Sequence, residues 1–304
     1  MQDAMPNAVV MTGYGAPEVL QWAEVPMPQP GEGQIRIKVR AAGVGPTDLD
    51  IRAGRLRFPL PPAPVLGYEV AGVVDAVGPG VLGTSVGDEV AALLFGRGGY
   101  AEYAVASIWT HKPESVSWVD AAALPSSVEA AAGVLRQLQV KKGETLLLLG
   151  GGGSVGVIAT QLAVAQGVKV ISAVGARDDN LAVELGACPV RYGSGLVDAV
   201  RSLGSVDAVF DAAGRGALAD AVELAGGPQR VITLSDHEAP EWGVALSTPT
   251  ADRAPGALDQ GMAMLAEGRL RMKSRRSMPL QNAAEAHRLL ESGDVRDRII
   301  LTVD

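Results

Sequence analysis

The chain has 304 residues, of which 47% are hydrophobic and 20% are charged, and its formal net charge is -8 at pH 7. This length and composition are typical of a folded protein with room for two domains, and they exclude intrinsic disorder. No apolar run approaches the ~20 residues that span a bilayer, the first residues lack the pattern of a signal peptide, and the basic residues are scattered. We therefore expect a cytoplasmic protein that binds neither membrane nor nucleic acid.

The first third of the chain is predicted to be rich in β-strands. Ile35, Ile37 and Val39 alternate with basic residues, which is the pattern of a strand with one buried face. Further strands are indicated by apolar runs at 70–77, 89–95 and 100–105.

From Ser127 onward, helical and strand patterns alternate. Ser127 is predicted to be the N-cap of an alanine-rich helix that ends near Leu138. The alternation that follows is typical of an α/β fold with a doubly wound parallel sheet. Its predicted strands are 168–171, 189–192, 206–210 and 230–234, and its later helices are 178–185, 196–203 and 217–224.

A glycine-rich turn between an apolar strand and the next helix carries the strongest local signal. Gly151, Gly153 and Gly156 have the spacing G-x-G-x-x-G. In this motif the first glycine makes the tight turn, the second lets a phosphate approach the backbone, and the third lets helix pack on strand. The helix that begins with Ser154 and Val155 would offer free N–H groups and its positive dipole end to an anion. The turn therefore predicts a dinucleotide-binding βαβ unit.

The end of the chain changes pattern again. A helix runs through Leu258 and Met262, another runs through Leu289, and a last strand is predicted at 298–303. We expect this strand to join the sheet of the first domain, because the doubly wound sheet is already complete.

Taken in this order, the motifs resemble the medium-chain dehydrogenase/reductase superfamily, and within it the zinc-independent quinone oxidoreductase-like branch. The resemblance runs nearly end to end. It is carried by AAGVGPTD at 41–48, GYEVAGVV at 67–74, VGDEV at 86–90, GYAEY at 99–103, AALP at 122–125, the glycine loop, and EAHR at 285–288.

The resemblance implies two domains. A β-rich GroES-like catalytic domain would comprise 1–120 and 250–304, and a Rossmann NADP-binding domain would comprise 121–249. It further implies an active site in the cleft between the domains, and homodimers joined through the Rossmann sheets.

The positions that match the zinc ligands of metal-dependent relatives hold other residues. These relatives use cysteine, histidine and cysteine where this chain has Gly45, Tyr68 and Pro125, none of which is an ordinary zinc ligand. The whole chain has one cysteine, Cys188, and three histidines, so few side chains of the kinds that usually bind zinc are present. The resemblance therefore implies metal-free hydride transfer from NADPH to a quinone or to the β-carbon of an α,β-unsaturated carbonyl.

Three residues at or beside these positions are candidates for catalysis. Tyr68 either donates a hydrogen bond or proton to the substrate, or only fills the volume that zinc occupies in relatives. Thr47 matches a relay hydroxyl of alcohol dehydrogenases, and its alternative is an ordinary hydroxyl bonded to local backbone. Asp48 matches a residue that orients the zinc-bound histidine, so its role here is structural or is to orient Tyr68. Gly45 stands where many quinone oxidoreductases have asparagine, so their substrate contacts do not transfer directly.

The choice of cofactor depends on the end of the second Rossmann strand. NAD enzymes place an acidic residue there to bind the ribose hydroxyls, and this chain has Gly175. With no carboxylate to repel a 2′-phosphate, and with Arg177 and Ser172 available to bind it, NADPH is favoured over NADH. Asp178 and Asp179 follow Arg177 directly and dilute its charge.

The resemblance points to four further positions. Tyr192 matches a tyrosine beside the adenosine end of the cofactor, and Ser235 is placed to line the nicotinamide side. Arg298 follows Asp297 where relatives have a glycine-lysine pair, and is expected to reach the cofactor. Glu129 falls where relatives have a threonine close to the nicotinamide, and would either change the polarity of the pocket or face solvent.

Two classes of function remain open at this point, with a third less favoured. The first is an NADPH-dependent reductase of a small electrophilic substrate, a quinone, enone or enoyl thioester. The second is an NADPH-binding redox sensor or scaffold with little turnover, in which the unusual residues reflect lost catalysis. The third is a zinc alcohol dehydrogenase.

Overall fold

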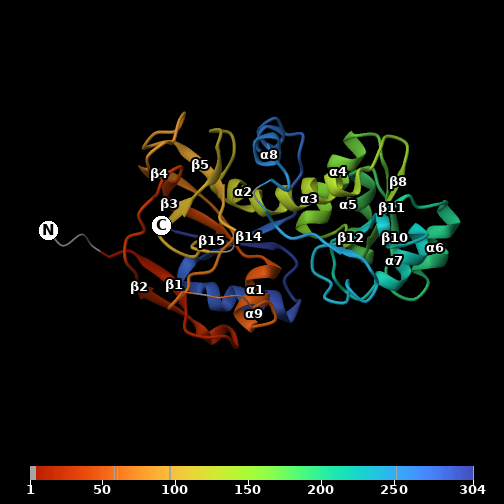
Figure 1. Ribbon diagram of the computed structural model, residues 1–304, viewed down its shortest axis with the longest axis horizontal. Coiled ribbons are helices and arrows are strands. Elements are labelled where there is room, and N and C mark those ends of the chain that lie inside the picture. Colours follow the sequence, from red (N-terminus) through yellow and green to blue (C-terminus); the bar gives the residue numbers. More distant parts are fainter. Residues whose placement is uncertain (1–4, 58, 60, 96, 251, 304) are drawn as a thin grey trace. The chain divides into compact units, whose positions relative to one another are not determined.

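The computed structural model describes residues 5–57, 59, 61–95, 97–250 and 252–303 (Figure 1). The chain divides into two compact units. Unit 1 comprises Met1–Ser126, Leu258–Arg269 and Ser274–Asp304, and unit 2 comprises Ser127–Ala257 and Leu270–Lys273.

Unit 1 is built on a seven-stranded sheet. Its path is β14-β15-β3-β4-β5-β7, and β6 pairs with β3. The strands are β3 (Ile35–Gly43), β4 (Glu69–Val77), β5 (Glu89–Leu93), β6 (Tyr103–Ala106), β7 (Ile108–His111), β14 (Arg275–Pro279) and β15 (Arg298–Thr302). A separate antiparallel pair consists of β1 (Asn7–Met11) and β2 (Leu20–Glu24).

The last strand returns to the first sheet, which confirms the prediction made for the end of the chain. β15 pairs antiparallel with β3, with Leu301 opposite Ala42, so the blue end of the chain runs beside an orange strand in Figure 1. β14 adds parallel to β15, with Arg275 opposite Arg298. Segments more than 200 positions apart in the sequence therefore share one sheet.

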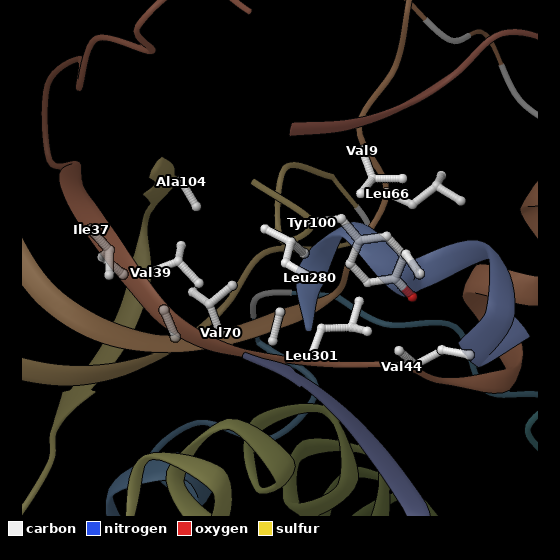
Figure 2. Packing of buried hydrophobic residues seen from close by; sticks show 14 of the residues in the cluster. Val9, Ile37, Val39, Val44, Leu66, Val70, Tyr100, Ala104, Leu280 and Leu301 are labelled. Atoms are coloured by element: carbon white, nitrogen blue, oxygen red, sulfur yellow. The ribbon is translucent and has the colours of Figure 1, made fainter. Parts of the chain in front are cut away.

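The core of unit 1 follows from the alternation in β3. Ile35, Ile37 and Val39 are at most 1% exposed, and the basic residues between them point to the other face. Figure 2 shows this cluster, in which the ring of Tyr100 lies among apolar side chains such as Leu66. Burying each large apolar side chain contributes about 1.5–3 kcal/mol, so this cluster holds the sheet and the loops above it in place.

The helices of unit 1 are short. They are α1 (Pro46–Ala53), α2 (Trp118–Ala123), α8 (Ala257–Ala266, which begins at the last residue of the first unit 2 segment) and α9 (Ala283–Ser292), with 3-10 turns η1 (Pro17–Val19) and η4 (Leu280–Asn282). The helices predicted around Met262 and Leu289 are confirmed as α8 and α9. In the part of the chain that the structure describes, every helix is too short or too polar to cross a membrane.

Unit 2 is a doubly wound parallel sheet of order β10-β9-β8-β11-β12-β13. The strands are β8 (Thr145–Leu149), β9 (Lys169–Val174), β10 (Cys188–Arg191), β11 (Ala208–Asp211), β12 (Val231–Thr233) and β13 (Ala245–Leu246). Its helices are α3 (Pro125–Leu138), α4 (Ser154–Ala165), α5 (Asp179–Glu184), α6 (Leu196–Leu203) and α7 (Leu218–Ala225), with η2 (Ala176–Asp178) and η3 (Pro228–Arg230). In chain order this is the strand order 3-2-1-4-5-6 of dinucleotide-binding folds, which confirms the predicted Rossmann architecture.

The start of α3 differs from the prediction. The helix begins at Pro125, so Ser127 lies inside its first turn and is not the N-cap. Its hydroxyl is buried without a hydrogen-bond partner. The Glu69 carboxylate accepts hydrogen bonds from the Ser126 N–H (2.8 Å) and the Ser126 Oγ (2.7 Å). A carboxylate distant in sequence thus accepts the hydrogen bond of an N–H group at the start of the helix. The local sequence around Ser127 contains no sign of this partner.

Candidate active site

The glycine loop of unit 2 is built from backbone that approaches other backbone closely. It follows β8, whose four leucines are buried, and it turns at Gly150 with a φ of +85°, a conformation that favours glycine. A Cβ on Gly156 would lie 2.7 Å from the Gly151 Cα, and one on Gly151 would overlap the Ser172 Oγ. Gly153 is the N-cap of α4 and contributes no side-chain hydrogen bond. The first N–H groups of α4, from Ser154 on, are therefore left for a ligand.

The position of Ser172 corrects one expectation. Ser172 lies in the interior of β9 and is 1% exposed, and its Oγ has no hydrogen-bond partner. It contacts the underside of the glycine loop, and does not present its hydroxyl to a ligand at the surface. Of the two residues expected to bind a 2′-phosphate, only Arg177 is exposed.

The acidic residues beside Arg177 have different surroundings. Asp179 forms an ion pair with Arg191 through both carboxylate oxygens, and this hydrogen bonding lowers the pKa of Asp179. Asp178 lies against the glycine loop, because a Cβ on Gly152 would be 2.5 Å from its Oδ2. The sequence suggested that both acids oppose Arg177. The structure shows that Asp179 is paired with Arg191. The carboxylate of Asp178 lies beside the glycine loop, at Gly152.

Two more predicted cofactor residues lie at the carboxyl ends of the strands. Tyr192 follows β10 and is 55% exposed. Ser235 is exposed after β12, and a Cβ on Gly214 would overlap its Oγ, so it lies close to the turn after β11. Both lie where ligands bind in open α/β sheets, and their contacts with a cofactor stay predictions.

Glu129 in unit 2 neither faces solvent nor stands unpaired. Its carboxylate pairs with the guanidinium of Arg253, from the Nε at 2.6 Å and from the Nη2. The Arg253 Nη1 donates to the Ser247 carbonyl oxygen and Oγ, both at 3.2 Å. Both members of the pair are less than 8% exposed. Sequence reasoning missed Arg253, because nothing in its local sequence connects it to a residue 124 positions earlier.

In unit 1, Asp48 joins the two loops that match metal-ligand positions. Its Oδ2 accepts from the Gly45 N–H at 2.8 Å, and its Oδ1 accepts from the Gly67 N–H at 3.1 Å. Asp48 is 1% exposed, and desolvation raises its pKa to about 6, although the Gly45 N–H and the charge of Arg298 oppose the rise. These bonds give Asp48 a structural role, and hold the backbone next to Tyr68.

Tyr68 is half-buried against the core of unit 1, and no hydrogen bond joins its hydroxyl to a described residue. Desolvation, with a smaller contribution from the charge of Asp48, raises the pKa of Tyr68 to about 12. The hydroxyl therefore keeps its proton at neutral pH and can act as a donor. Thr47 occupies the first turn of α1 and is half-buried, and the local backbone hydrogen bond considered for its hydroxyl is not formed within the described residues.

Arg298 lies beside Gly45 and Asp48 in unit 1. Its Nη2 pairs with the Glu69 Oε1 and donates to the Ser126 Oγ at 3.3 Å. Its side chain is 10% exposed and that of Glu69 is fully buried. Glu69 and Ser126 were missed by the sequence reasoning, although each directly follows one of the vacated zinc-ligand positions. The contact of Arg298 with the cofactor stays a prediction.

A second buried polar contact lies deeper in unit 1. The Tyr100 hydroxyl is 3.2 Å from the His287 Nε2, and both residues are fully buried. Desolvation lowers the pKa of His287 to about 3, so this histidine is neutral at physiological pH. A neutral, buried histidine bonded to a tyrosine is a packing residue.

The residues present do not fit a zinc ion of the usual kind. Gly45 and Pro125 have no donor side chain, and Tyr68 alone offers a hydroxyl whose pKa is raised. Among the described residues, nowhere do three or more His, Cys, Asp or Glu side chains gather as a metal site. The donor chemistry at the three matching positions is therefore wrong for zinc.

Comparison with known families agrees with this architecture. The family model of the alcohol dehydrogenase GroES-like domain matches residues 31–113. The family model named zinc-binding dehydrogenase matches residues 185–301.

Individual relatives extend the similarity to the whole chain. A quinone oxidoreductase of Sus scrofa is 32% identical over 97% of this chain and 97% of its own. A 2-methylene-furan-3-one reductase of Solanum lycopersicum is 34% identical over 73% of this chain and 61% of its own. A mycobacterial structure complexed with NADPH has a TM-score of 0.84 and 28% identity, over 98% of this chain and 100% of its own.

Fold and sites together define a two-unit dehydrogenase, in which a GroES-like unit accompanies a Rossmann unit. The chain belongs to the medium-chain dehydrogenase/reductase superfamily and is an oxidoreductase of its quinone oxidoreductase-like group.

Proposed function

We propose that this protein is an NADPH-dependent oxidoreductase that reduces a quinone or an α,β-unsaturated carbonyl compound without zinc. The observation that carries the proposal is the glycine loop of unit 2, where close backbone contacts leave the N-terminus of α4 uncapped by any side chain. A loop of this construction in a sheet of this strand order is suited to a dinucleotide pyrophosphate.

In unit 2, the glycine loop and the start of α4 would bind the pyrophosphate of the cofactor. Gly151, Gly153 and Gly156 would let the pyrophosphate approach the backbone, and the N–H groups from Ser154 and Val155 on would bind its oxygens. When bound, the reduced nicotinamide supplies a hydride. No protein group has to provide redox chemistry, so the chain's own task is to bind, orient and exclude water.

The preference for NADPH over NADH rests on Gly175 and Arg177. Gly175, directly after β9, has no carboxylate, and Arg177 is exposed with no ion-pair partner among the described residues. Arginine suits a phosphate because it can donate two parallel hydrogen bonds. Asp178 works against this preference, since its carboxylate lies at Gly152.

The substrate class follows from what unit 1 offers. Quinones and enones are electrophilic already and need no metal to accept a hydride. They need a donor for the oxygen that becomes negative, and loss of one such donor typically costs about 3–4 kcal/mol of barrier. The protonated hydroxyl of Tyr68 is one candidate. The names of the similar proteins, quinone oxidoreductase and 2-methylene-furan-3-one reductase, support the same class.

The proposal is tested by following NADPH oxidation at 340 nm over a panel of quinones, enones and enoyl thioesters, with NADH in parallel. We expect turnover of at least one class, with NADPH preferred. Tight NADPH binding without turnover of any compound would favour the redox sensor or scaffold. The pairing of Glu129 with Arg253 weakens that alternative, since it gives an unusual residue a structural role. Stoichiometric zinc in the purified protein, measured by elemental analysis, would contradict metal-free chemistry.

We also propose that the protein is a homodimer joined through the edge of the Rossmann sheet. β13 is the edge strand, and Leu246 and nearby Trp242 are 44% and 41% exposed. An unpaired strand edge with apolar side chains can pair with the same edge of a second copy about a two-fold axis. Light scattering should give a dimer mass, and Leu246→Lys should shift it towards the monomer.

A further inference from the structure

The vacated zinc positions of unit 1 surround a cation that the chain itself supplies. A Cβ on Gly45 would lie 3.7 Å from both the Nη1 and the Nη2 of Arg298. Glu69, which follows Tyr68, pairs with the Nη2, and Ser126, which follows Pro125, has its Oγ 3.3 Å from the same nitrogen. The guanidinium therefore touches Gly45 and the immediate neighbours of the other two positions.

The hydrogen bonds of this arginine are incomplete. Glu69 uses its Oε2 for the Ser126 N–H and Oγ and offers its Oε1 to the Arg298 Nη2. The Arg298 Nε is buried and has no partner. No hydrogen bond joins the Nη1 to a described residue either. A guanidinium has five N–H donors. The buried Nε is left without an acceptor, and the N–H groups of the Nη1, which is not among the buried atoms without a partner, are free to donate to a ligand.

A ligand atom beside the guanidinium would fit over Gly45 without a clash. The atoms nearest to a Cβ placed there are the Asp48 Oδ2 at 3.6 Å and the two Arg298 nitrogens at 3.7 Å, which is ordinary van der Waals separation. The backbone of Gly45, with φ -122° and ψ 165°, is one that any residue adopts, so glycine is not required there by conformation. What glycine provides at this position is room in front of the guanidinium.

We propose that Arg298 takes the place of the metal cation and is a catalytic residue that binds the substrate oxygen on which negative charge develops. This inference rests on the proposed reduction of a quinone or enone. Hydride addition to the β-carbon breaks the C=C π bond, and the electron pair moves to leave an enolate oxygen while the nicotinamide is oxidised. The Arg298 Nη1 donates to that oxygen, and a proton from solvent then adds to the α-carbon to give the saturated carbonyl.

A chromogenic probe tests the oxyanion site without requiring turnover. 4-Nitrophenol imitates the enolate, because its phenolate form carries negative charge on an oxygen conjugated to a C=C system and absorbs in the visible. The full chain, saturated with NADP+, is titrated with 4-nitrophenol at several pH values. We expect binding to lower the apparent pKa of the phenol, with its ionisation constant raised about tenfold or more by the charged donor. Failure to bind, or binding without such a shift, overturns the proposal.

Variants assign the shift to Arg298. Arg298→Met should abolish it and Arg298→Lys should keep part of it. Gly45→Val should also abolish it while leaving the arginine in place, by filling the space. The matched control is Arg275→Met, which removes the cross-strand neighbour that pairs with Asp120, and should leave the shift unchanged. A shift that survives in Arg298→Met would overturn the proposal. If Arg298→Met fails to fold, Glu69→Gln combined with Arg298→Met removes both charges, and Gly45→Val tests the site independently.

Two further readouts separate this role from others. If Arg298 instead contacts the cofactor, as the family resemblance suggested, Arg298→Met will weaken NADP+ binding in a calorimetric titration and the proposal is wrong. With an active substrate, we expect the variant to lower kcat about 100-fold or more while the KM for NADPH is kept. A wild-type protein that ionises 4-nitrophenol but reduces no compound would refute the proposed function and leave the oxyanion site standing.

Discussion

Each unit of the molecule buries an arginine against a glutamate, and the two pairs differ in how completely the arginine is used. In unit 2, Arg253 employs all three of its nitrogens, on Glu129 and on the carbonyl and hydroxyl of Ser247. In unit 1, the Nη2 of Arg298 is bonded, while its Nε is buried without a partner. A guanidinium with every nitrogen satisfied ties the chain together. One with unused donors, beside a glycine over which a further atom fits without a clash, is equipped to bind a ligand.

This difference could not be seen in the residue types. Glu129 and Arg298 both depart from the family pattern. The sequence assigned Arg298 to the cofactor and left Glu129 either in the nicotinamide pocket or facing solvent. The surroundings separate them, because the value of a charge inside a protein depends on which hydrogen bonds surround it. Variants of these residues and of their neighbours test that separation.

Removing the acid of the fully bonded pair should affect stability most. Glu129→Thr restores the residue type of relatives but leaves the Arg253 charge buried and unpaired, which typically costs about 3–5 kcal/mol. Chemical denaturation should show this loss in the free energy of unfolding. Glu267→Thr is the control, because its pair with Arg269 is more than half exposed and should matter by less than about 1 kcal/mol. A loss as small as that of the control would mean that Glu129 is not a structural partner.

Asp48, beside the incompletely bonded arginine, should make stability depend on pH. Burial raises its pKa from 3.8 to about 6, so between these values the folded protein holds a proton that the unfolded chain has released. The contribution of Asp48 to the free energy of unfolding therefore falls as pH rises through this window, by about 3 kcal/mol in all, and is constant above it.

Asp48→Asn removes this titration. The stability of the wild type relative to Asp48→Asn should decline from pH 4 to pH 6 and then level, as measured by denaturation at a series of pH values. A difference that is flat over this range, or that grows with pH, would contradict the raised pKa of Asp48.

Tyr68 tests whether a neutral donor works beside Arg298. If its hydroxyl donates to the developing oxyanion, Tyr68→Phe should lower kcat by about 10- to 100-fold, since a hydrogen bond to a charged group contributes roughly 1.5–3 kcal/mol. The matched control is Tyr103→Phe, on strand β6 of the same sheet. An unchanged kcat in Tyr68→Phe would mean that the Tyr68 hydroxyl is not the donor and that the ring only fills space.

Arg177 extends the comparison to an exposed arginine with no ion-pair partner in the described chain. Arg177→Ala should weaken NADPH binding by about tenfold, the value of one charge-assisted contact, and leave NADH binding nearly unchanged. Fluorescence titration with both cofactors gives the ratio. Arg201→Ala, which removes an exposed arginine paired with Glu223, is the control. An equal loss of affinity for NADPH and for NADH would show that Arg177 does not bind the 2′-phosphate.

Contiguous motifs were predicted well. The glycine loop, the doubly wound parallel sheet and the return of the last strand were all predictable, because each depends on patterns of apolar residues and glycines along the chain. The start of α3 was not, since its N-terminus is satisfied by Glu69 from another element. Ser172 was expected to be available to a 2′-phosphate, and only the packing of β9 beneath the loop shows that it is buried.

By itself the sequence determined the architecture, the family and the glycine loop, because these depend on neighbouring residues and on backbone geometry that favours glycine. The tertiary structure decided the roles of the charged side chains. Arg298, Glu69, Ser126 and Gly45 meet only when β15 pairs with β3, and Glu129 meets Arg253 only when a distant loop packs on α3. Whether a buried charge is a structural tie or a binding group depends on the partners that folding brings to it, and those partners are not its sequence neighbours.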